Sequence, residues 1–166
     1  MLKMPDDFYG TAPALKADAA PADVETTQSI IEAMYESICG PAGQPRRWNR
    51  IRSLCLPQAC FIRVGKLPEG TLGCKVMRTP EYIEQMEPWL LANGFYEKEV
   101  HRVEERFGNI AQVFSTYESR RSADDPEPFM RGVNSFQLMH DGRRWWIVNV
   151  MWQHESPENP LPPEYL

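Results

Sequence analysis

The chain has 166 residues, a length typical of one domain with a single hydrophobic core. Its formal net charge is −5 and no run of Lys or Arg exceeds two residues, which argues against the clustered basic face that nucleic-acid binding requires. No stretch approaches the roughly 20 apolar residues of a membrane-spanning helix. The first ten residues, MLKMPDDFYG, also lack the apolar segment of a secretory signal. We therefore expect neither a nucleic-acid partner nor a membrane partner.

The cysteines lack the C-x-x-C spacing of metal and redox sites. They are Cys39, Cys55, Cys60 and Cys74. Such thiols are typical of small buried hydrophobic groups in a reducing compartment. No nucleotide-binding motif, zinc motif or serine-nucleophile motif is present. We expect free structural thiols, no metal, no other cofactor and a cytoplasmic location.

The first part of the chain is expected to be an arm followed by helices. Residues 1–23 are rich in Ala, Pro and Asp with little periodicity, and predict a flexible arm ahead of a domain over residues 24–156. The first helix follows, capped by Asp23 or Thr26 and stopped by Gly40-Pro41. Its buried stripe has the 3.6-residue spacing of a helix and consists of Ile30, Ile31, Met34, Tyr35 and Ile38.

A second helix and a third helix are separated by two short strands. The second helix begins near Pro45, carries an apolar stripe from Trp48 to Leu54, and is closed by Pro57. Apolar runs at 59–64 and 72–77 predict the strands. The third helix starts at 79–81, where a hydroxyl, a proline and an acid follow one another, and ends at Gly94. Pro88 should kink or split it.

Residues 97–155 predict an antiparallel meander of four strands. Gly108-Asn109 and Asp141-Gly142 are typical of two-residue hairpin turns, and a Pro-rich loop at 122–128 joins the two hairpins. Two-residue turns give the expected strand partners. They place Phe107 opposite Ile110, Val103 opposite Phe114, Val100 opposite Tyr117, Leu138 opposite Trp145, Gln137 opposite Trp146, Ser135 opposite Val148, and Arg131 opposite Trp152.

Alternation along the last strand then gives two rows of side chains, and both are mostly apolar. One row is Trp146, Val148, Val150 and Trp152, and the other is Trp145, Ile147, Asn149 and Met151. A sheet with one wet face should alternate apolar and polar residues. We therefore expect helices to cover one face and a second copy of the chain to cover the other, giving a homodimer through the outer sheet face. The alternative is cover by the arm or by the Pro-rich tail at 157–166, within one chain.

The order of helices followed by a bent meander resembles the cone-shaped α+β fold of the nuclear transport factor 2-like superfamily. That group includes SnoaL-like cyclases, ketosteroid isomerases and scytalone dehydratase. The runs EVHRVEERFGNIAQVFSTYESR and RGVNSFQLMHDGRRWWIVNVMWQHE resemble bacterial members of unassigned function in particular. The resemblance covers about residues 25–156. It implies a curved, mostly antiparallel sheet, three helices on its concave face, a deep pocket between them, and dimerisation through the convex face.

The resemblance does not identify a reaction, because one fold hosts many activities. Isomerases of this fold place a carboxylate base on the first strand, yet that strand reads ACFIRVG and offers Arg63 without an acid. Tyr35 matches the position of the tyrosine in these isomerases, but a tyrosine without the carboxylate base cannot abstract a proton. Tyr117 and His101 are the other candidate catalytic groups, although a lone His among apolar neighbours is usually structural.

The acids Glu97, Glu99, Glu104 and Glu105 alternate with basic residues, a pattern typical of cross-strand ion pairs. Arg102 is the exception, because its register directs it into the cone, where it can receive an anion. The expected pocket wall is aromatic with a few polar groups. The candidate ligand-binding residues are Trp48, Arg102, Tyr117, Ser135, Gln137, Trp146 and Trp152.

These observations favour a protein that binds a small apolar or aromatic molecule. The first alternative is a SnoaL-like, metal-independent cyclase, dehydratase or isomerase. The second is a structural or accessory homodimer whose cone is filled by its own side chains. An open cavity on the order of 300 Å³ or more would separate the first two from the third.

Overall fold

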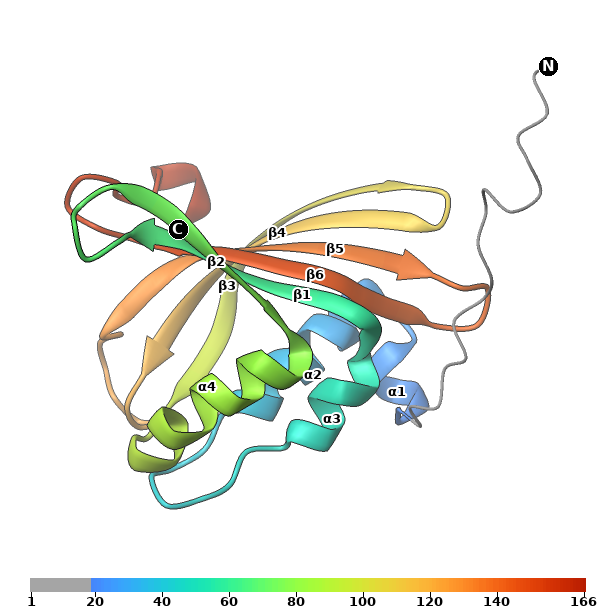
Figure 1. Ribbon diagram of the computed structural model, residues 1–166. Coiled ribbons are helices and arrows are strands. Elements are labelled where there is room, and N and C mark those ends of the chain that lie inside the picture. Colours follow the sequence, from blue (N-terminus) through green and yellow to red (C-terminus); the bar gives the residue numbers. More distant parts are fainter. Residues whose placement is uncertain (1–18) are drawn as a thin grey trace.

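The computed structural model describes residues 19–166 and confirms the expected α+β class. Six strands form one strongly curved sheet in the order β2-β1-β6-β5-β4-β3, and the helices lie across its concave face (Figure 1). β1 and β6 are parallel, and all other neighbours are antiparallel. The strands are β1 (Cys55–Lys66), β2 (Leu72–Arg78), β3 (Tyr96–Phe107), β4 (Ile110–Arg120), β5 (Met130–His140) and β6 (Trp145–His154).

The described helices begin with a short turn that the expected arm did not include. α1 (Pro21–Val24) buries Val24, and Asp23 forms an ion pair of 2.7 Å with Arg50. Residues 21–23 therefore belong to the folded domain, while residues 1–18 of the expected arm lie outside the described residues.

Helix α2 (Thr27–Ile38) forms where the apolar stripe predicts it. Thr26 caps it by accepting a hydrogen bond of 2.9 Å from the Ser29 backbone N–H, as in a capping box. Ile30 and Ile31 are fully buried against the sheet. The helix places Tyr35 over the concave face, so the same pattern that forms the helix also positions a site residue.

Helices α3 (Trp48–Leu54) and α4 (Thr79–Ala92) complete the helical layer. α3 ends at Leu54, and β1 begins at once, so Pro57 lies inside a strand instead of closing the helix. The pairing of β1 with β6 is irregular between Cys55 and Cys60, which accommodates this proline. α4 continues through Pro88, so the expected split does not occur.

The register of the first hairpin is as expected up to a bulge. Phe107 pairs with Ile110 and Val103 with Phe114, but Glu99, not Val100, pairs with Tyr117. The irregularity lies between Glu99 and His101. The predicted pairing of Val100 with Tyr117 is therefore wrong.

The second hairpin differs more, because its loop has four residues instead of two. The Asp141 carboxylate accepts hydrogen bonds from the backbone N–H groups of Arg143 (2.8 Å) and Arg144 (2.9 Å). His140 therefore pairs with Trp145, and the four predicted pairings of this hairpin are wrong. The observed partners of Leu138, Gln137, Ser135 and Trp152 are Ile147, Asn149, Met151 and Asn134, and Gly132 pairs with His154.

A bulge near Val148 also divides the expected rows of β6. The partners of Gln137 and Leu138 are Asn149 and Ile147, so the alternation changes phase there. Trp145 and Ile147 belong to the main core, and Val150 and Trp152 also face the helices. Trp146 lies on the convex side. It pairs with Met139, which in turn pairs with Ile110, and Ile110 is exposed on that side.

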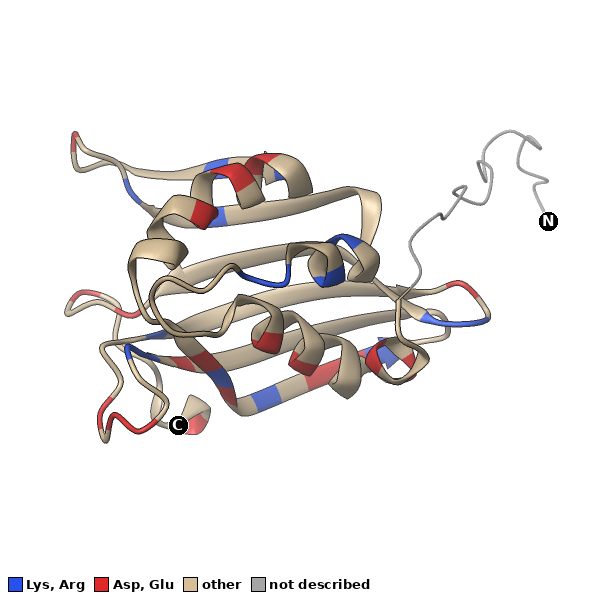
Figure 2. Cartoon of the chain, turned by 90° about the horizontal axis from the view of Figure 1, so that it is seen from below, with Lys and Arg blue, Asp and Glu red and all other residues tan. Residues whose placement is uncertain are grey.

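Charged residues of both signs are interspersed along the helices and along β3 (Figure 2). The ion pairs of β3 run within the strand, from Arg102 to Glu99 at 2.9 Å and to Glu104 at 3.3 Å. The expected cross-strand pairing of these acids is therefore wrong for Glu99 and Glu104.

The Pro-rich tail returns to the convex face. The 3-10 helix η2 (Pro163–Tyr165) brings the Tyr165 ring to 5.8 Å from His101 and 6.0 Å from Phe114. The tail therefore covers part of the outer face within one chain. Strand register aligns one row of side chains on this face across all six strands as Val103, Phe114, Ser135, Met151, Ile62 and Val76. Within this row Tyr165 contacts Phe114, whereas Val103, Met151 and Val76 are exposed. We call this row the convex band.

Candidate functional site

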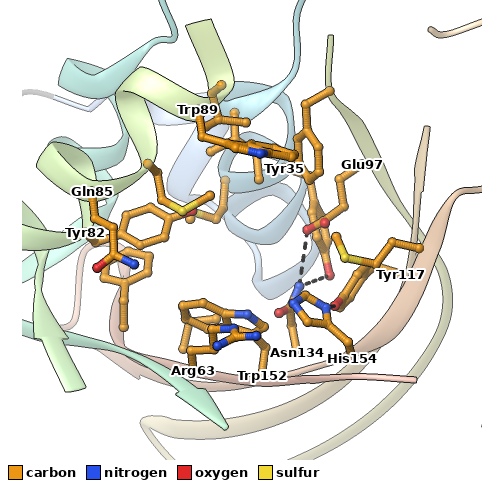
Figure 3. A pocket seen from close by; sticks show the side chains of 18 of the residues that line it. Tyr35, Arg63, Tyr82, Gln85, Trp89, Glu97, Tyr117, Asn134, Trp152 and His154 are labelled. Atoms are coloured by element: carbon orange, nitrogen blue, oxygen red, sulfur yellow. Dashed lines mark hydrogen bonds between the residues drawn. The ribbon is translucent and has the colours of Figure 1, made fainter. Parts of the chain in front are cut away.

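A cavity of about 520 Å³ lies between α2, α4 and the concave face of the sheet (Figure 3). Most of its wall is aromatic or aliphatic. The apolar wall consists of Met34, Ile38, Phe61, Tyr82, Met86, Trp89, Leu90, Phe95, Phe129, Met130, Phe136, Val150 and Trp152. A volume of this size suits a drug-sized molecule. The cone is therefore not filled by its own side chains.

The aromatic wall is fixed by ring packing. Tyr82 of α4 stacks on Phe61 of β1 with ring centres 4.2 Å apart, and Trp152 meets the Tyr82 ring edge-on at 6.1 Å. Trp48 supports Tyr82 from behind at 6.4 Å and donates its indole N–H to Glu87. These contacts hold flat apolar surfaces around an open space, as a flat ligand requires.

Glu97, at the start of β3, brings a carboxyl group to the cavity. Ser119 donates a hydrogen bond of 2.8 Å to Oε2, and the Asn134 amide approaches Oε1 at 3.5 Å. Burial raises the pKa of Glu97 to about 7, although the hydrogen bonds from Ser119 and Asn134 act in the opposite direction. Near neutral pH this group is therefore present both as an acid and as a base.

Tyr35 lies beside Glu97 in the same hydrogen-bond network. Asn134 donates to the Tyr35 hydroxyl at 3.0 Å, and that hydroxyl lies 2.7 Å from Oγ of Ser115. Ser115 in turn donates to Glu99. Burial and the nearby Glu97 carboxylate raise the pKa of Tyr35 far above its ordinary value, so it remains a protonated phenol.

Tyr117 and His154 form a second polar pair at the cavity. The Tyr117 hydroxyl lies 2.7 Å from Nδ1 of His154. Burial and the positive charge of Arg63 lower the pKa of His154, so the ring is neutral at pH 7 and Nδ1 can accept the phenol proton. Gly132 makes room for this pair, because a Cβ there would lie 2.5 Å from the Tyr117 hydroxyl oxygen.

The structure brings three of the sequence-derived candidates to the cavity, namely Tyr35, Tyr117 and Trp152. Arg102 is on the concave side, but its ion pairs with Glu99 and Glu104 hold it away from the cavity wall. Trp48 lies one layer behind the wall.

The other candidates lie on the convex side. His101 contacts Tyr165 of the tail, and Gln137 donates to Gln112 across neighbouring strands at 3.2 Å. Ser135 belongs to the convex band. Trp146 is buried under Arg144, whose guanidinium lies 3.5 Å from the ring centre, and donates its N–H to Asp141. Ser135, Gln137 and Trp146 were expected to share a wall with Tyr117 and Trp152, but Tyr117 pairs with Gly132 and the bulge near Val148 separates Trp152 from Trp146, so the two groups lie on opposite faces.

Sequence reasoning missed five polar residues of the cavity wall, which are Arg63, Gln85, Glu97, Asn134 and His154. Glu97 was hidden by the charge alternation around it, although Ser119 lies directly opposite on β4. The first strand supplies no acid to the cavity, as its sequence indicates, but β3 supplies Glu97, which was expected to form a cross-strand ion pair.

Comparison with known proteins establishes the fold and no more. No family model and no curated protein matches the chain. Among solved structures, an uncharacterised protein with a cystatin-like fold from Caulobacter vibrioides is 11% identical with a TM-score of 0.57, covering 81% of this chain and 90% of its own. A nuclear transport factor 2-like protein of unknown function from Silicibacter pomeroyi DSS-3 is 14% identical with a TM-score of 0.51, covering 77% and 92%.

A candidate ketosteroid isomerase from Parabacteroides distasonis ATCC 8503 is 12% identical with a TM-score of 0.53, covering 79% of this chain and 89% of its own. The chain therefore has the nuclear transport factor 2-like, cystatin-like fold, and the expected resemblance is confirmed at that level. Among residues 19–166, no helix is both long enough and apolar enough to cross a membrane.

Proposed function

We propose that the protein binds a small, flat, largely apolar molecule in the cavity between α2, α4 and the sheet. The observation that carries this proposal is an open space of about 520 Å³ with an aromatic wall and a few polar groups. Natural small-molecule sites have this composition, because apolar walls supply affinity while sparse polar groups fix orientation. A purely structural protein of this size has no need of such a space, because native interiors are close-packed.

The neutral fluorophore N-phenyl-1-naphthylamine tests this proposal. It should bind and accept energy from Trp152 and Trp89, which line the cavity. Val150→Phe places a larger side chain in the cavity and should weaken binding at least tenfold, while Val133→Phe, outside the cavity wall, should not. Fluorescence titration measures both affinities, and circular dichroism checks the fold. Equal affinity of the two variants would place the probe elsewhere and refute the proposal.

A second candidate function is metal-independent acid–base catalysis. The observation that favours it is Glu97, a buried carboxyl group with a pKa of about 7 at the cavity wall, linked through Asn134 to the protonated Tyr35. A general base is most effective when its pKa lies near the working pH. A neighbouring phenol can stabilise the oxyanion that forms when a proton leaves the carbon next to a carbonyl group. Tyr117 and His154 could then hold the other end of a substrate.

We also propose that two copies of the chain associate through the convex band. Val103, Met151 and Val76 expose 45%, 42% and 58% of their surface although they align across one sheet face. An exposed row that is mostly apolar is typical of an isologous interface, in which the same patch meets itself. A cytoplasmic location is proposed with it, supported by four separate free thiols.

Light scattering during size-exclusion chromatography should give twice the mass of one chain. Val103→Lys combined with Met151→Lys should give the mass of a single chain, because four like charges would meet in a symmetric contact. Leu91→Lys serves as the matched control, since Leu91 is an exposed apolar residue on α4. A wild-type protein that remains monomeric at high concentration would end this proposal.

A further inference from the structure

Arg63 is the one arginine among residues 19–166 that lines the cavity. Arg50, Arg102 and Arg131 each form an ion pair with a carboxylate, at 2.7 Å, 2.9 Å and 2.9 Å. These three lie outside the cavity lining, whereas Arg63 lines it and pairs with no carboxylate of residues 19–166. An unpaired guanidinium at the edge of an apolar cavity is suited to a planar anion.

The strands hold Arg63 at the cavity mouth, which we define as the exposed wall residues Arg63, Gln85, Trp89 and Phe129. It lies on β1 beside Trp152 of β6, with which it is in register, and Figure 3 shows the two side chains together. On its other side it is in register with Lys75 of β2, whose ammonium group contacts the Gln85 amide oxygen.

The mouth is therefore positive, although the whole chain carries a net charge of −5. Neither Lys75 nor Arg63 has an acidic partner among the described residues. The positive potential reaches inward, because Arg63 acts on the pKa of His154 and of Tyr117. The carboxyl of Glu97 lies across the cavity from Arg63 (Figure 3), so the two ends of the site differ in chemistry.

We propose that the ligand of this cavity is an amphipathic organic anion, an aromatic or alicyclic carboxylate whose acidic group pairs with Arg63. Its apolar body lies along Trp152 and Tyr82. A neutral hydrogen-bonding group at its far end meets Glu97 and Asn134. This inference rests on the proposed binding function and adds the class and the orientation of the ligand. It transfers the expected anion contact from Arg102 to Arg63.

Two fluorescent probes of nearly the same shape test this charge requirement. 8-Anilinonaphthalene-1-sulfonate carries one negative charge, and N-phenyl-1-naphthylamine carries none. Wild-type protein should bind the anionic probe more tightly, and only that preference should weaken as salt is raised. Arg63→Met should reduce affinity for the anionic probe about tenfold, as expected for loss of one charged hydrogen-bond partner, and leave the neutral probe within about twofold.

Arg143→Met is the matched control, because it removes the same charge from the exposed 141–144 loop. It should change neither affinity. Arg63→Lys should retain part of the preference, since it keeps the charge but loses the planar fork. Displacement of the neutral probe by 2-naphthoate and by 2-acetylnaphthalene extends the test from sulfonate to carboxylate.

The outcomes separate the two proposals. Failure of the neutral probe to enter the wild-type cavity refutes the binding function itself. Two results would refute the anion inference alone, provided that the neutral probe binds wild-type protein. In the first, Arg63→Met lowers the affinity for both probes equally; in the second, it leaves the affinity for the anionic probe unchanged. Selective loss of the anionic probe and of 2-naphthoate in Arg63→Met supports it.

Discussion

Replacing Glu97 by glutamine should make the protein more stable at pH 8 and remove part of its pH dependence. Burial raises the pKa of this carboxyl to about 7 from an ordinary value of 4.5. Below pH 4.5 the group is protonated in both the folded and the unfolded state, so the folded protein has its full stability with respect to this group. Between pH 4.5 and 7 the unfolded chain ionises this carboxyl while the folded protein keeps it protonated, so stability on the order of 3 kcal/mol is lost by about pH 7.

Urea denaturation of wild type and Glu97→Gln at several pH values measures this effect. The difference between their free energies of unfolding should grow from about pH 4.5 to pH 7 and then level off. Glu105→Gln, an exposed change on the same strand, is the control and should produce no such difference. A constant difference across this range would show that Glu97 has an ordinary pKa.

The same variant separates a binding protein from an enzyme. If Glu97 is a general base, wild-type protein should catalyse exchange of deuterium from solvent into the carbon next to the carbonyl of a cyclic ketone, and Glu97→Gln should not. Mass spectrometry of the ketone after incubation in deuterated water reports the exchange. Binding of the neutral probe should survive the substitution, because the apolar wall is unchanged. Exchange that persists in the variant would remove Glu97 from the catalytic proposal.

Replacing Arg46 by methionine should destabilise the protein by about 3 kcal/mol or more. Its guanidinium is buried and donates to five backbone carbonyl groups, which belong to Gly40, Pro41, Gln44, Leu90 and Asn93. These bonds join the loop after α2 to the end of α4, so Arg46 fixes the distance between the two helices that frame the cavity. Methionine fills similar space but leaves the carbonyl groups without their donor.

Arg47→Met is the natural control, because the neighbouring side chain is exposed. It should change the free energy of unfolding by less than about 0.5 kcal/mol. Denaturation midpoints in urea, at constant slope, measure both variants. Equal effects of the two substitutions would mean that the buried carbonyl groups find water or other donors once the guanidinium is removed.

The fold could be predicted from the sequence because periodicity and turn residues act locally. The stripe from Ile30 to Ile38 matches α2, and Gly108-Asn109 sets the first hairpin as expected. The site was harder to predict, because it depends on which face each strand presents. One carboxylate, Asp141, lengthens the second turn by accepting backbone and indole hydrogen bonds, which shifts the pairing by two residues. The bulge near Val148 then places Trp146 and Trp152, which strict alternation puts in one row, on opposite faces of the sheet.

The polar groups of the cavity show the same limit. Glu97 belongs to a segment of alternating charges that is typical of a solvated strand. Only its contacts with Ser119 and Asn134 distinguish it from the other acids of that segment. His154 enters the site because the bulge near Val148 brings it opposite Gly132. Neither this bulge nor the one in β3 between Glu99 and His101 has a local sequence signal as strong as that of the hairpin turn residues.

Methyl NMR with labelled methionine tests most directly whether the cavity is a binding site. Met34, Met86 and Met130 line the cavity, whereas Met151 is exposed on the convex face and serves as an internal control. Adding N-phenyl-1-naphthylamine should shift the three cavity signals and leave that of Met151 in place. Shifts confined to Met151, or no shift in any of the four, would contradict a ligand site between the helices and the concave face of the sheet.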